Sequence, residues 1–267
     1  NITHLNKFWP DAEWDDSAKP LLEKYIASLH EAEKTKEEKE KEFSDKYDFI
    51  FKTQPYDHQL KAFYLSRDKD AFALLMEQGT GKTKVGIDNA AYLYGQGKIT
   101  ALVVVAPNGV HRNWLNKEIP AHMPDWCPYK SVYYYSGMGA KGAEKFNEML
   151  LAEDCLKIFS FNCEAFVSKT AVALMNRILL SNSVMLVVDE SSRIKTPGAK
   201  RTKLITKFGK MVKYRRIMTG TPVTKGPEDV FSQFRFLDPN ILGYDSFSSF
   251  KSRYCIMGGY EQKQIVA

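Results

Sequence analysis

Short apolar segments alternate with amphipathic segments from about residue 71 onward. The apolar segments have the length of strands, and the amphipathic ones repeat apolar side chains at helical spacing. The expected strands are AFALLM, ITALVVVA, SVYYY, LKIFSF, SVMLVVD and YRRIMTG, and the expected helices cover residues 82–94, 112–119, 141–151, 169–180 and 200–208. Apolar strands that alternate with helices predict a three-layer α/β fold, with a central, mostly parallel sheet covered on both faces.

The first part of the chain has a different pattern. Apolar residues recur at helical spacing between residues 21 and 29, and the charge run HEAEKTKEEKEKEFSDK follows them. Because this run alternates in sign, it favours a solvated helix supported by Glu–Lys pairs, and an arm that binds a specific partner is the alternative. We therefore expect a helical N-terminal extension at residues 1–50 and one folded domain at residues 51–267.

Composition and charge bear on the kind of partner, the redox state and the cellular compartment. The net charge of +6 permits an anionic partner without requiring one. The four cysteines form neither a C-x-x-C pair nor a cluster with histidine, which favours a reduced protein without a structural metal. The sequence has no apolar run of about eighteen residues and no signal-peptide pattern, so we expect a cytoplasmic protein with no membrane partner.

A glycine-rich segment follows the first apolar run. Since the carboxyl ends of parallel strands form the ligand-binding edge of such sheets, a turn at this place is a candidate site. Its glycines let backbone N–H groups point at a phosphate, Lys82 reaches the β- and γ-phosphates, and the Thr83 hydroxyl can bind Mg²⁺. The candidate nucleotide-binding residues are Gln78, Gly79, Thr80, Gly81, Lys82 and Thr83. Met76 stands where the usual eight-residue signature begins with Gly or Ala, and a chance match is the alternative.

Two carboxylates, Asp189 and Glu190, end another buried strand. In phosphate-transferring enzymes an Asp at this place holds Mg²⁺, and a following Glu can polarise the attacking water. A helix cap is the alternative reading of the pair. We therefore expect ATP and Mg²⁺ as cofactors, with Lys82, Asp189 and Glu190 as catalytic residues and with Thr83 and Asp189 as metal ligands.

The order of these motifs resembles the first RecA-like lobe of superfamily 2 helicases, particularly the Swi/Snf-type DNA translocases, from about residue 55 to the end. QGTGKT resembles motif I, DESSRIK the DEAH-R-I-K form of motif II, MTGTP motif III, and PEDVFSQFRFLDPNILG the continuation after motif III. The resemblance implies a P-loop NTPase that couples ATP hydrolysis to movement on DNA. Ser191 and Ser192 depart from it by replacing Ala-His, which makes Thr219 and Thr221 the expected relay between the site and motif III.

The resemblance also implies contacts outside the phosphate loop. Gln59 lies in a segment similar to the glutamine motif, in which the amide reads both hydrogen-bonding edges of adenine, and a plain helix-opening role is the alternative. ALVVVAPNGVHRNW resembles motif Ia and SFN resembles motif Ib, which touch the nucleic-acid backbone. The expected nucleic-acid contacts are Pro107, Asn108, Arg112, Ser160, Asn162 and Lys195, each with a surface loop as the alternative. For the run Tyr133-Tyr134-Tyr135 we expect core packing in preference to base stacking.

The family pattern implies a motor of two lobes, of which this sequence matches one. We expect a second RecA-like lobe, in cis or in trans, to supply an arginine finger, so that the chain alone binds Mg-ATP and hydrolyses it slowly. R-I-K and T-G-T-P favour duplex DNA over RNA as the partner, because the DEAD-type RNA enzymes have S-A-T as motif III. An RNA helicase lobe and a nucleotide-binding module without motor activity are the alternatives. The compact loops favour a bacterial cell or a virus-infected host as the source.

Overall fold

A computed structural model describes residues 49–258 and 264–265. The chain divides into two compact units, Asn1–Ile50 and Phe51–Ala267, and the helices and strands described below all belong to the second. The helical extension expected at residues 1–50 lies outside the described residues up to residue 48.

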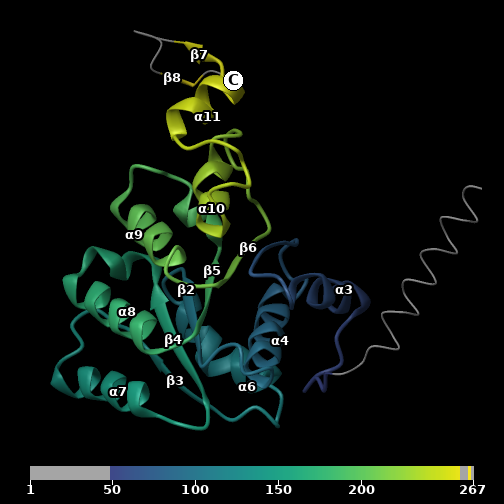
Figure 1. The fold of residues 1–267 in the computed structure, drawn as a ribbon, viewed down its shortest axis with the longest axis vertical. Coiled ribbons are helices and arrows are strands. Elements are labelled where there is room, and N and C mark those ends of the chain that lie inside the picture. The colour runs from purple at the N-terminus through teal and green to yellow at the C-terminus, as the bar shows by residue number, and fades with distance from the viewer. Residues whose placement is uncertain (1–48, 259–263, 266–267) are drawn as a thin grey trace, which may run out of the picture. The chain divides into compact units, whose positions relative to one another are not determined.

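Six parallel strands form the central sheet of the second unit (Figure 1). They are β1 (Ala71–Leu75), β2 (Ala101–Ala106), β3 (Tyr129–Tyr133), β4 (Leu156–Asn162), β5 (Val184–Asp189) and β6 (Tyr214–Thr219). Their order is β1-β6-β5-β2-β4-β3. Every residue of β2 and β5 is buried, as expected for central strands covered on both faces. The predicted α/β architecture is therefore confirmed, and all six predicted strands are present.

Helices cover both faces of this sheet, with α3, α4 and α6 on one side in Figure 1 and α7, α8 and α9 on the other. The bounds on the first side are α3 (Asp57–Ser66), α4 (Lys82–Gly95), α5 (Val110–Asn113), the π-helical turn η1 (Trp114–Glu118) and α6 (Ile119–His122). Those on the second are α7 (Ala140–Leu151), η2 (Cys163–Val167), α8 (Lys169–Ser181) and α9 (Lys200–Gly209), and the 3₁₀ turn η3 (Ser191–Ile194) follows β5. These layers match the predicted three-layer fold.

The helix expected at residues 112–119 is divided by the π-helical turn. There the backbone N–H of Ile119 bonds the carbonyl of Trp114, five residues earlier. Pro120 follows directly, and because it has no N–H it cannot continue the ordinary helical ladder. The apolar periodicity of this segment does not reveal the interruption.

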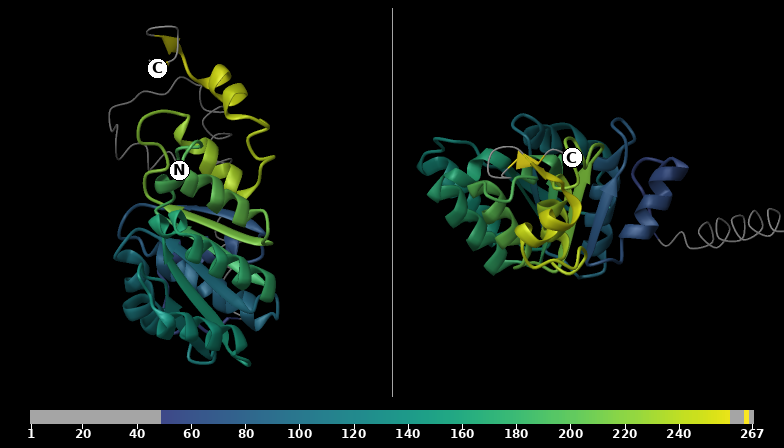
Figure 2. Two further views of the ribbon diagram at one scale, coloured as in Figure 1. Left: turned by 90° about the vertical axis from the view of Figure 1, so that its left-hand side faces the viewer. Right: turned by 90° about the horizontal axis from the view of Figure 1, so that it is seen from above.

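The segment after β6 forms α10 (Asp229–Leu237), α11 (Phe247–Tyr254) and a short antiparallel pair, β7 (Met257–Gly258) with β8 (Gln264–Ile265). Helix α10 packs against α9 and β6. The ring of Phe231 on α10 lies 5.3 Å from the rings of Phe247 and Phe250 on α11, so α11 adjoins α10 beyond the sheet (Figure 2).

A chain of phenylalanine rings fills the core between the sheet and the second layer of helices. The centroids of Phe146, Phe161, Phe166 and Phe208 follow one another at 5.9, 5.6 and 5.4 Å. Burying such a side chain contributes about 1.5–3 kcal/mol. The Tyr134 ring joins this core by stacking on Phe161 at 5.6 Å.

Within the described residues no helix is long and apolar enough to cross a membrane. The four cysteines, Cys127, Cys155, Cys163 and Cys255, are free thiols and are buried.

Buried Arg216 on β6 ties together the elements that flank the glycine-rich loop between β1 and α4, residues 76–81, which we call the phosphate loop. Its guanidinium donates to the Ser66 carbonyl at 2.7 Å, to Asn89 Oδ1 at 3.2 Å and to the Asp70 carbonyl at 3.3 Å. Burial lowers the pKa of Arg216 to about 10. Because these acceptors belong to α3, to α4 and to the residue before β1, one side chain holds the base of the phosphate loop in place.

Candidate nucleotide site and nucleic-acid edge

The phosphate loop joins β1 to α4 at the carboxyl edge of the sheet. Gly79 and Gly81 have φ of +77° and +82°, which glycine adopts without the steric cost that other residues meet. A Cβ on Gly81 would lie 2.2 Å from Gln59 Nε2. The buried Lys82 ammonium donates to the carbonyls of Met76 and Glu77, both at 2.9 Å, so it bridges its own loop. A phosphate binding there must replace these two hydrogen bonds.

Gln59 and His58 on α3 both contact the phosphate loop at the carbonyl of Thr80. Gln59 Nε2 donates to the Thr80 carbonyl at 3.0 Å, and its Oε1 accepts from the Tyr56 backbone N–H at 3.1 Å. His58 Nε2 lies 2.9 Å from the same carbonyl. Both ends of the Gln59 amide are thus engaged, and adenine contact by Gln59 stays a prediction that requires one of these bonds to exchange. His58 was not among the predicted site residues.

Asp189 and Glu190 stand at the end of β5. Asp189 Oδ2 accepts from the indole N–H of Trp114 at 2.8 Å, and its Oδ1 accepts from the Glu190 backbone N–H at 2.9 Å. Burial raises the pKa of Asp189 above its usual value, the charge of Glu190 adds to this effect, and the Trp114 bond and the charge of Lys82 oppose it. Glu190 has φ of +48°, a conformation that costs a non-glycine residue about 1–2 kcal/mol.

The turn after β6 touches both the phosphate loop and Glu190. Thr219 Oγ1 donates to Glu190 Oε2 at 3.3 Å and accepts from the Thr221 backbone N–H at 3.2 Å. A Cβ on Gly220 would lie 3.2 Å from the Gln78 backbone nitrogen. The structure therefore brings three separate sequence motifs together at one place, with Thr219 in direct contact with Glu190 and Thr221 linked through its backbone.

Trp114 and Gln233 belong to this site, and sequence reasoning did not single them out. Trp114 is 1% exposed, and its ring adjoins Gly86 of α4, where an added Cβ would lie 3.4 Å from it.

Gln233 on α10 is fully buried. Its Oε1 accepts from Ser191 Oγ at 2.6 Å, and its Nε2 donates to the Pro222 carbonyl at 2.7 Å. Ser191, where the family has Ala, is thus linked through Gln233 to the loop after motif III. A lone glutamine among the apolar residues of FSQFRFL is the available sequence signal.

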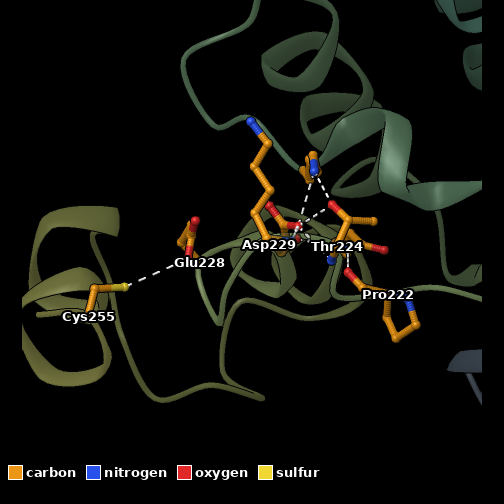
Figure 3. Close-up of polar contacts among 8 residues, drawn as sticks. Pro222, Thr224, Glu228, Asp229 and Cys255 are labelled. Carbon is orange, nitrogen blue, oxygen red and sulfur yellow. Dashed lines mark hydrogen bonds and ion pairs between the residues drawn. The ribbon is translucent and has the colours of Figure 1, made fainter. Parts of the chain in front are cut away.

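Asp229 organises the loop that follows motif III (Figure 3). Its Oδ2 accepts from the Thr224 backbone N–H at 2.8 Å, from Thr224 Oγ1 at 2.6 Å, from the Lys225 N–H at 2.9 Å and from Lys195 Nζ at 3.1 Å. Burial by itself raises the pKa of Asp229, but the hydrogen bonds from Thr224, Lys195 and Lys225 outweigh it and lower the pKa to about 2. Lys195 is therefore ion-paired within the protein. Contact between Lys195 and nucleic acid stays a prediction that requires this pair to open.

The other expected nucleic-acid residues lie at the carboxyl ends of β2 and β4, which are neighbours in the sheet. Asn108 and Arg112 are exposed, Asn162 is half-buried and Pro107 is buried. Ser160 is a correction, because its side chain is fully buried and donates to the His111 carbonyl at 2.8 Å. The Ser160 hydroxyl positions the loop that carries Arg112 and is out of reach of a polymer. A buried hydroxyl and an exposed one look alike in sequence.

Solved and curated proteins resemble the chain across this fold. The ATPase core of the Sulfolobus solfataricus SWI2/SNF2 protein in complex with double-stranded DNA aligns with a TM-score of 0.58 and 24% identity, covering 76% of this chain and 39% of that one. A Caenorhabditis elegans homologue of the SWI/SNF-related, matrix-associated, actin-dependent regulator of chromatin subfamily A-like protein 1 is 24% identical over 75% of this chain and 26% of its own length. The human subfamily A member containing DEAD/H box 1 is 29% identical over 62% of this chain and 15% of its own length.

This chain thus spans about a quarter or less of the length of these two curated relatives. The model of the SNF2-related domain matches residues 56–266, which include the phosphate loop, the Asp189–Glu190 pair and the turn after β6. Because that match takes in most of the sequence, the chain belongs to the SNF2-related domain family.

Proposed function

We propose that this chain is the ATP-binding lobe of a DNA-dependent ATPase of the Swi/Snf type, which hydrolyses Mg-ATP and couples hydrolysis to movement on duplex DNA. The observation that carries the proposal is the contact of Thr219 with Glu190 beside the phosphate loop. Three motifs that lie far apart in sequence meet there, as a phosphate-transferring site requires.

ATP binding is assigned to the phosphate loop. Its N–H groups at the start of α4 lie where a helix terminus favours an anion, and Lys82 exchanges its two carbonyl acceptors for phosphate oxygens. Gln59 holds the loop and is proposed to read adenine. When the Lys82 ammonium turns to phosphate, the Met76 and Glu77 carbonyls lose it as a donor and take other hydrogen-bond partners.

The residues beside the loop fit a magnesium ion. Thr83 offers a hydroxyl and Asp189 a carboxylate, and oxygen ligands of this kind are those that Mg²⁺ prefers. When bound, the ion neutralises charge on the phosphate oxygens. The Trp114 N–H and the Glu190 N–H orient the Asp189 carboxylate, while the nearby positive charge of Lys82 favours its ionised form.

Glu190 is assigned the general-base role on the attacking water. Its unusual backbone conformation turns the chain at the end of β5, and the Thr219 hydroxyl donates to one carboxylate oxygen. The second oxygen is then the one that accepts a proton from water. Movement of the turn after β6 therefore alters the orientation of Glu190, which links this turn to the rate of hydrolysis.

DNA and a second RecA-like lobe, in cis or in trans, are the proposed partners. The Sulfolobus SWI2/SNF2 ATPase core was solved in complex with double-stranded DNA. Exposed Asn108 and Arg112 offer polar and cationic contacts to a phosphate backbone. The second lobe is proposed to supply the arginine that stabilises the transferring phosphate. A cytoplasmic location in a bacterial or virus-infected cell stays a prediction from the sequence.

Calorimetry with Mg-ATP tests the proposal on the 267-residue chain. Lys82→Ala should weaken binding roughly 10- to 100-fold, because a hydrogen bond to a charged group contributes about 1.5–3 kcal/mol. Lys61→Ala, an exposed lysine on α3, is the matched control and should bind as the parent does. Competition by GTP measures selectivity for adenine, and hydrolysis with added duplex DNA or RNA measures the response to each polymer. Equal Mg-ATP affinity of the parent and Lys82→Ala would contradict the assigned site.

A further inference from the structure

A hollow lies beside β3, and of its lining residues only Arg112 has a role assigned above. Its volume is about 570 Å³, within the range of about 300–1,000 Å³ for ligand pockets. The walls come from α5, from β3 and the loop after it, and from α7, and they include Arg112, Tyr133, Tyr135, Gly142 and Lys145. We call it the β3 pocket.

Two tyrosine rings form one wall of the β3 pocket. The rings of Tyr133 and Tyr135 have centroids 5.9 Å apart, and Tyr135 is 40% exposed. Tyr134, between them in sequence, points the other way and stacks on Phe161 in the core. Such alternation is usual for an extended chain, and it places Tyr134 in the core while the other two rings lie on the pocket side. Tyr133 is half-buried and its ring contacts that of His111, so the exposed ring of Tyr135 is the platform for a nucleobase.

Two cations accompany these rings. The Arg112 guanidinium lies 5.2 Å from the centroid of the Tyr133 ring, and Lys145 reaches the pocket from α7. Both side chains are exposed, and neither forms an ion pair with another described residue. None of the residues lining the pocket is acidic. Aromatic faces with unpaired cations beside them suit a base that carries phosphates.

The pocket continues the edge assigned to DNA. β3 pairs with β4 as β4 pairs with β2, and Tyr133 lies opposite Ser160 in the register. The Tyr134 N–H bonds the Ser160 carbonyl at 2.8 Å, and the Ser160 hydroxyl bonds the His111 carbonyl at 2.8 Å. Ser160 thereby ties the loop that bears Arg112 to the start of the tyrosine wall. A DNA strand bound along the carboxyl ends of β2 and β4 therefore reaches the β3 pocket next.

The wall opposite the tyrosines is close. A Cβ on Gly142 would lie 2.9 Å from Met138 Cβ and 3.3 Å from Tyr135 Oη, so only a glycine lets α7 approach the loop at this distance. The pocket is therefore a bounded recess beside an open edge. A base stacked inside a duplex has both faces covered and cannot enter such a recess without leaving the stack.

We propose that the β3 pocket binds one unpaired nucleotide of a DNA strand, with the base stacked on Tyr135 and the phosphates paired with Arg112 and Lys145. The proposal rests on the proposed function, because the strand is the one held at Asn108 and Arg112. It adds a preference for DNA that contains an unpaired base over fully paired DNA.

Two DNA duplexes of equal length test this on the 267-residue chain, one with a single unpaired 2-aminopurine bulge and one with the same base paired. The bulged duplex should bind at least about fivefold tighter, since stacking one base on an aromatic side chain contributes roughly 1–3 kcal/mol. Its fluorescence should fall on binding because the base stacks. Tyr135→Leu should remove both effects, and Tyr129→Leu, at the start of β3 and outside the pocket, should leave them unchanged.

A second variant probes the charge without changing the exposed aromatic wall. Lys145→Gln should weaken both duplexes and reduce the slope of log affinity against log salt by about 1, whereas Lys169→Gln, an exposed lysine at the start of α8, should not. Equal affinity for bulged and paired DNA would overturn the proposal that the β3 pocket binds an unpaired nucleotide, and it would leave the proposed function standing. Binding of neither duplex would overturn both, and an equal gain with a bulged RNA duplex would overturn the assignment to DNA.

Discussion

The two halves of the carboxyl edge of the sheet differ in how their predicted residues are held. At β1, β5 and β6, Lys82 is hydrogen-bonded within the phosphate loop, and Thr219 is hydrogen-bonded to Glu190 beside it. At β2 and β4 the predicted contacts are dispersed, with Asn108 exposed and Ser160 buried. Phosphate transfer needs charges held at fixed places, whereas a polymer backbone can be held by main-chain groups and scattered side chains. Residue identity is therefore more informative in the nucleotide half.

The largest expected effect separates chemistry in the nucleotide half from DNA binding in the other half. Glu190→Gln should lower the rate of ATP hydrolysis roughly 10²- to 10⁴-fold, because the amide cannot accept the proton of the attacking water. Mg-ATP affinity and DNA affinity should stay near those of the parent. Single-turnover hydrolysis with duplex DNA, alongside calorimetry and anisotropy, makes the comparison.

Glu228→Gln serves as the matched control, since this carboxylate lies on the loop after motif III, against Cys255 (Figure 3). If Glu190→Gln hydrolysed ATP as fast as Glu228→Gln, Glu190 would not be the base. If Glu190→Gln lost DNA affinity as well, ATP hydrolysis and DNA binding would not depend on separate halves of the edge.

A smaller effect is expected at Trp114, which follows β2 in the chain but donates to Asp189 at the end of β5. Trp114→Phe keeps an aromatic ring and removes the N–H donor, so Mg-ATP affinity should fall about tenfold. Because the bond lowers the pKa of Asp189, its loss should raise that pKa further. Magnesium binding requires the carboxylate, and the affinity of Trp114→Phe should therefore begin to fall at a higher pH than that of the parent as the solution is acidified.

Mg-ATP titrations over a pH series measure this shift. Trp126→Phe, at a tryptophan that is 40% exposed, is the control and should follow the parent. Identical pH profiles for Trp114→Phe and the parent would show that the indole acts through packing alone. The Trp114 N–H would then not influence the pKa of Asp189.

The smallest effect concerns Asp229, which holds the predicted polymer contact Lys195 within the protein. Asp229→Asn keeps an acceptor oxygen but loses the charge, and it should lower the free energy of unfolding at neutral pH by about 1 kcal/mol. The folded-state pKa of Asp229 is lowered to about 2, so its contribution is present above the unfolded pKa of about 3.9 and is lost as pH falls toward 2.

Urea unfolding at several pH values checks this. The stability difference between parent and Asp229→Asn should shrink below about pH 4. Asp238→Asn, at a carboxylate beyond the C-terminal end of α10, is the control. A difference that is constant with pH would show that Asp229 is not the titrating group. DNA binding by the variant measures whether releasing Lys195 adds a contact to the polymer half.

The sequence was sufficient for the sheet, because alternation of buried strands with amphipathic helices follows from local patterns of apolar residues. All six strands and the helix after the phosphate loop were predicted from it. The interruption at Trp114 could not be, since the bond from Ile119 to the Trp114 carbonyl leaves the apolar spacing intact. The sequence also could not tell buried Ser160 from a surface serine, because exposure depends on the loop that packs over it.

By itself, the sequence determined the family, the layered fold and the residue types of the nucleotide site. The reason is that G-x-G-K-T and the Asp-Glu pair supply the phosphate-binding and metal-binding groups directly, from their own backbone and side chains. Only the tertiary structure decided which side chains support them. Trp114 reaches Asp189 across 75 positions, and Ser191 reaches Gln233 across 42. Contacts of this kind form only when distant strands and helices pack together, and nothing in the local chemistry of either residue specifies its partner.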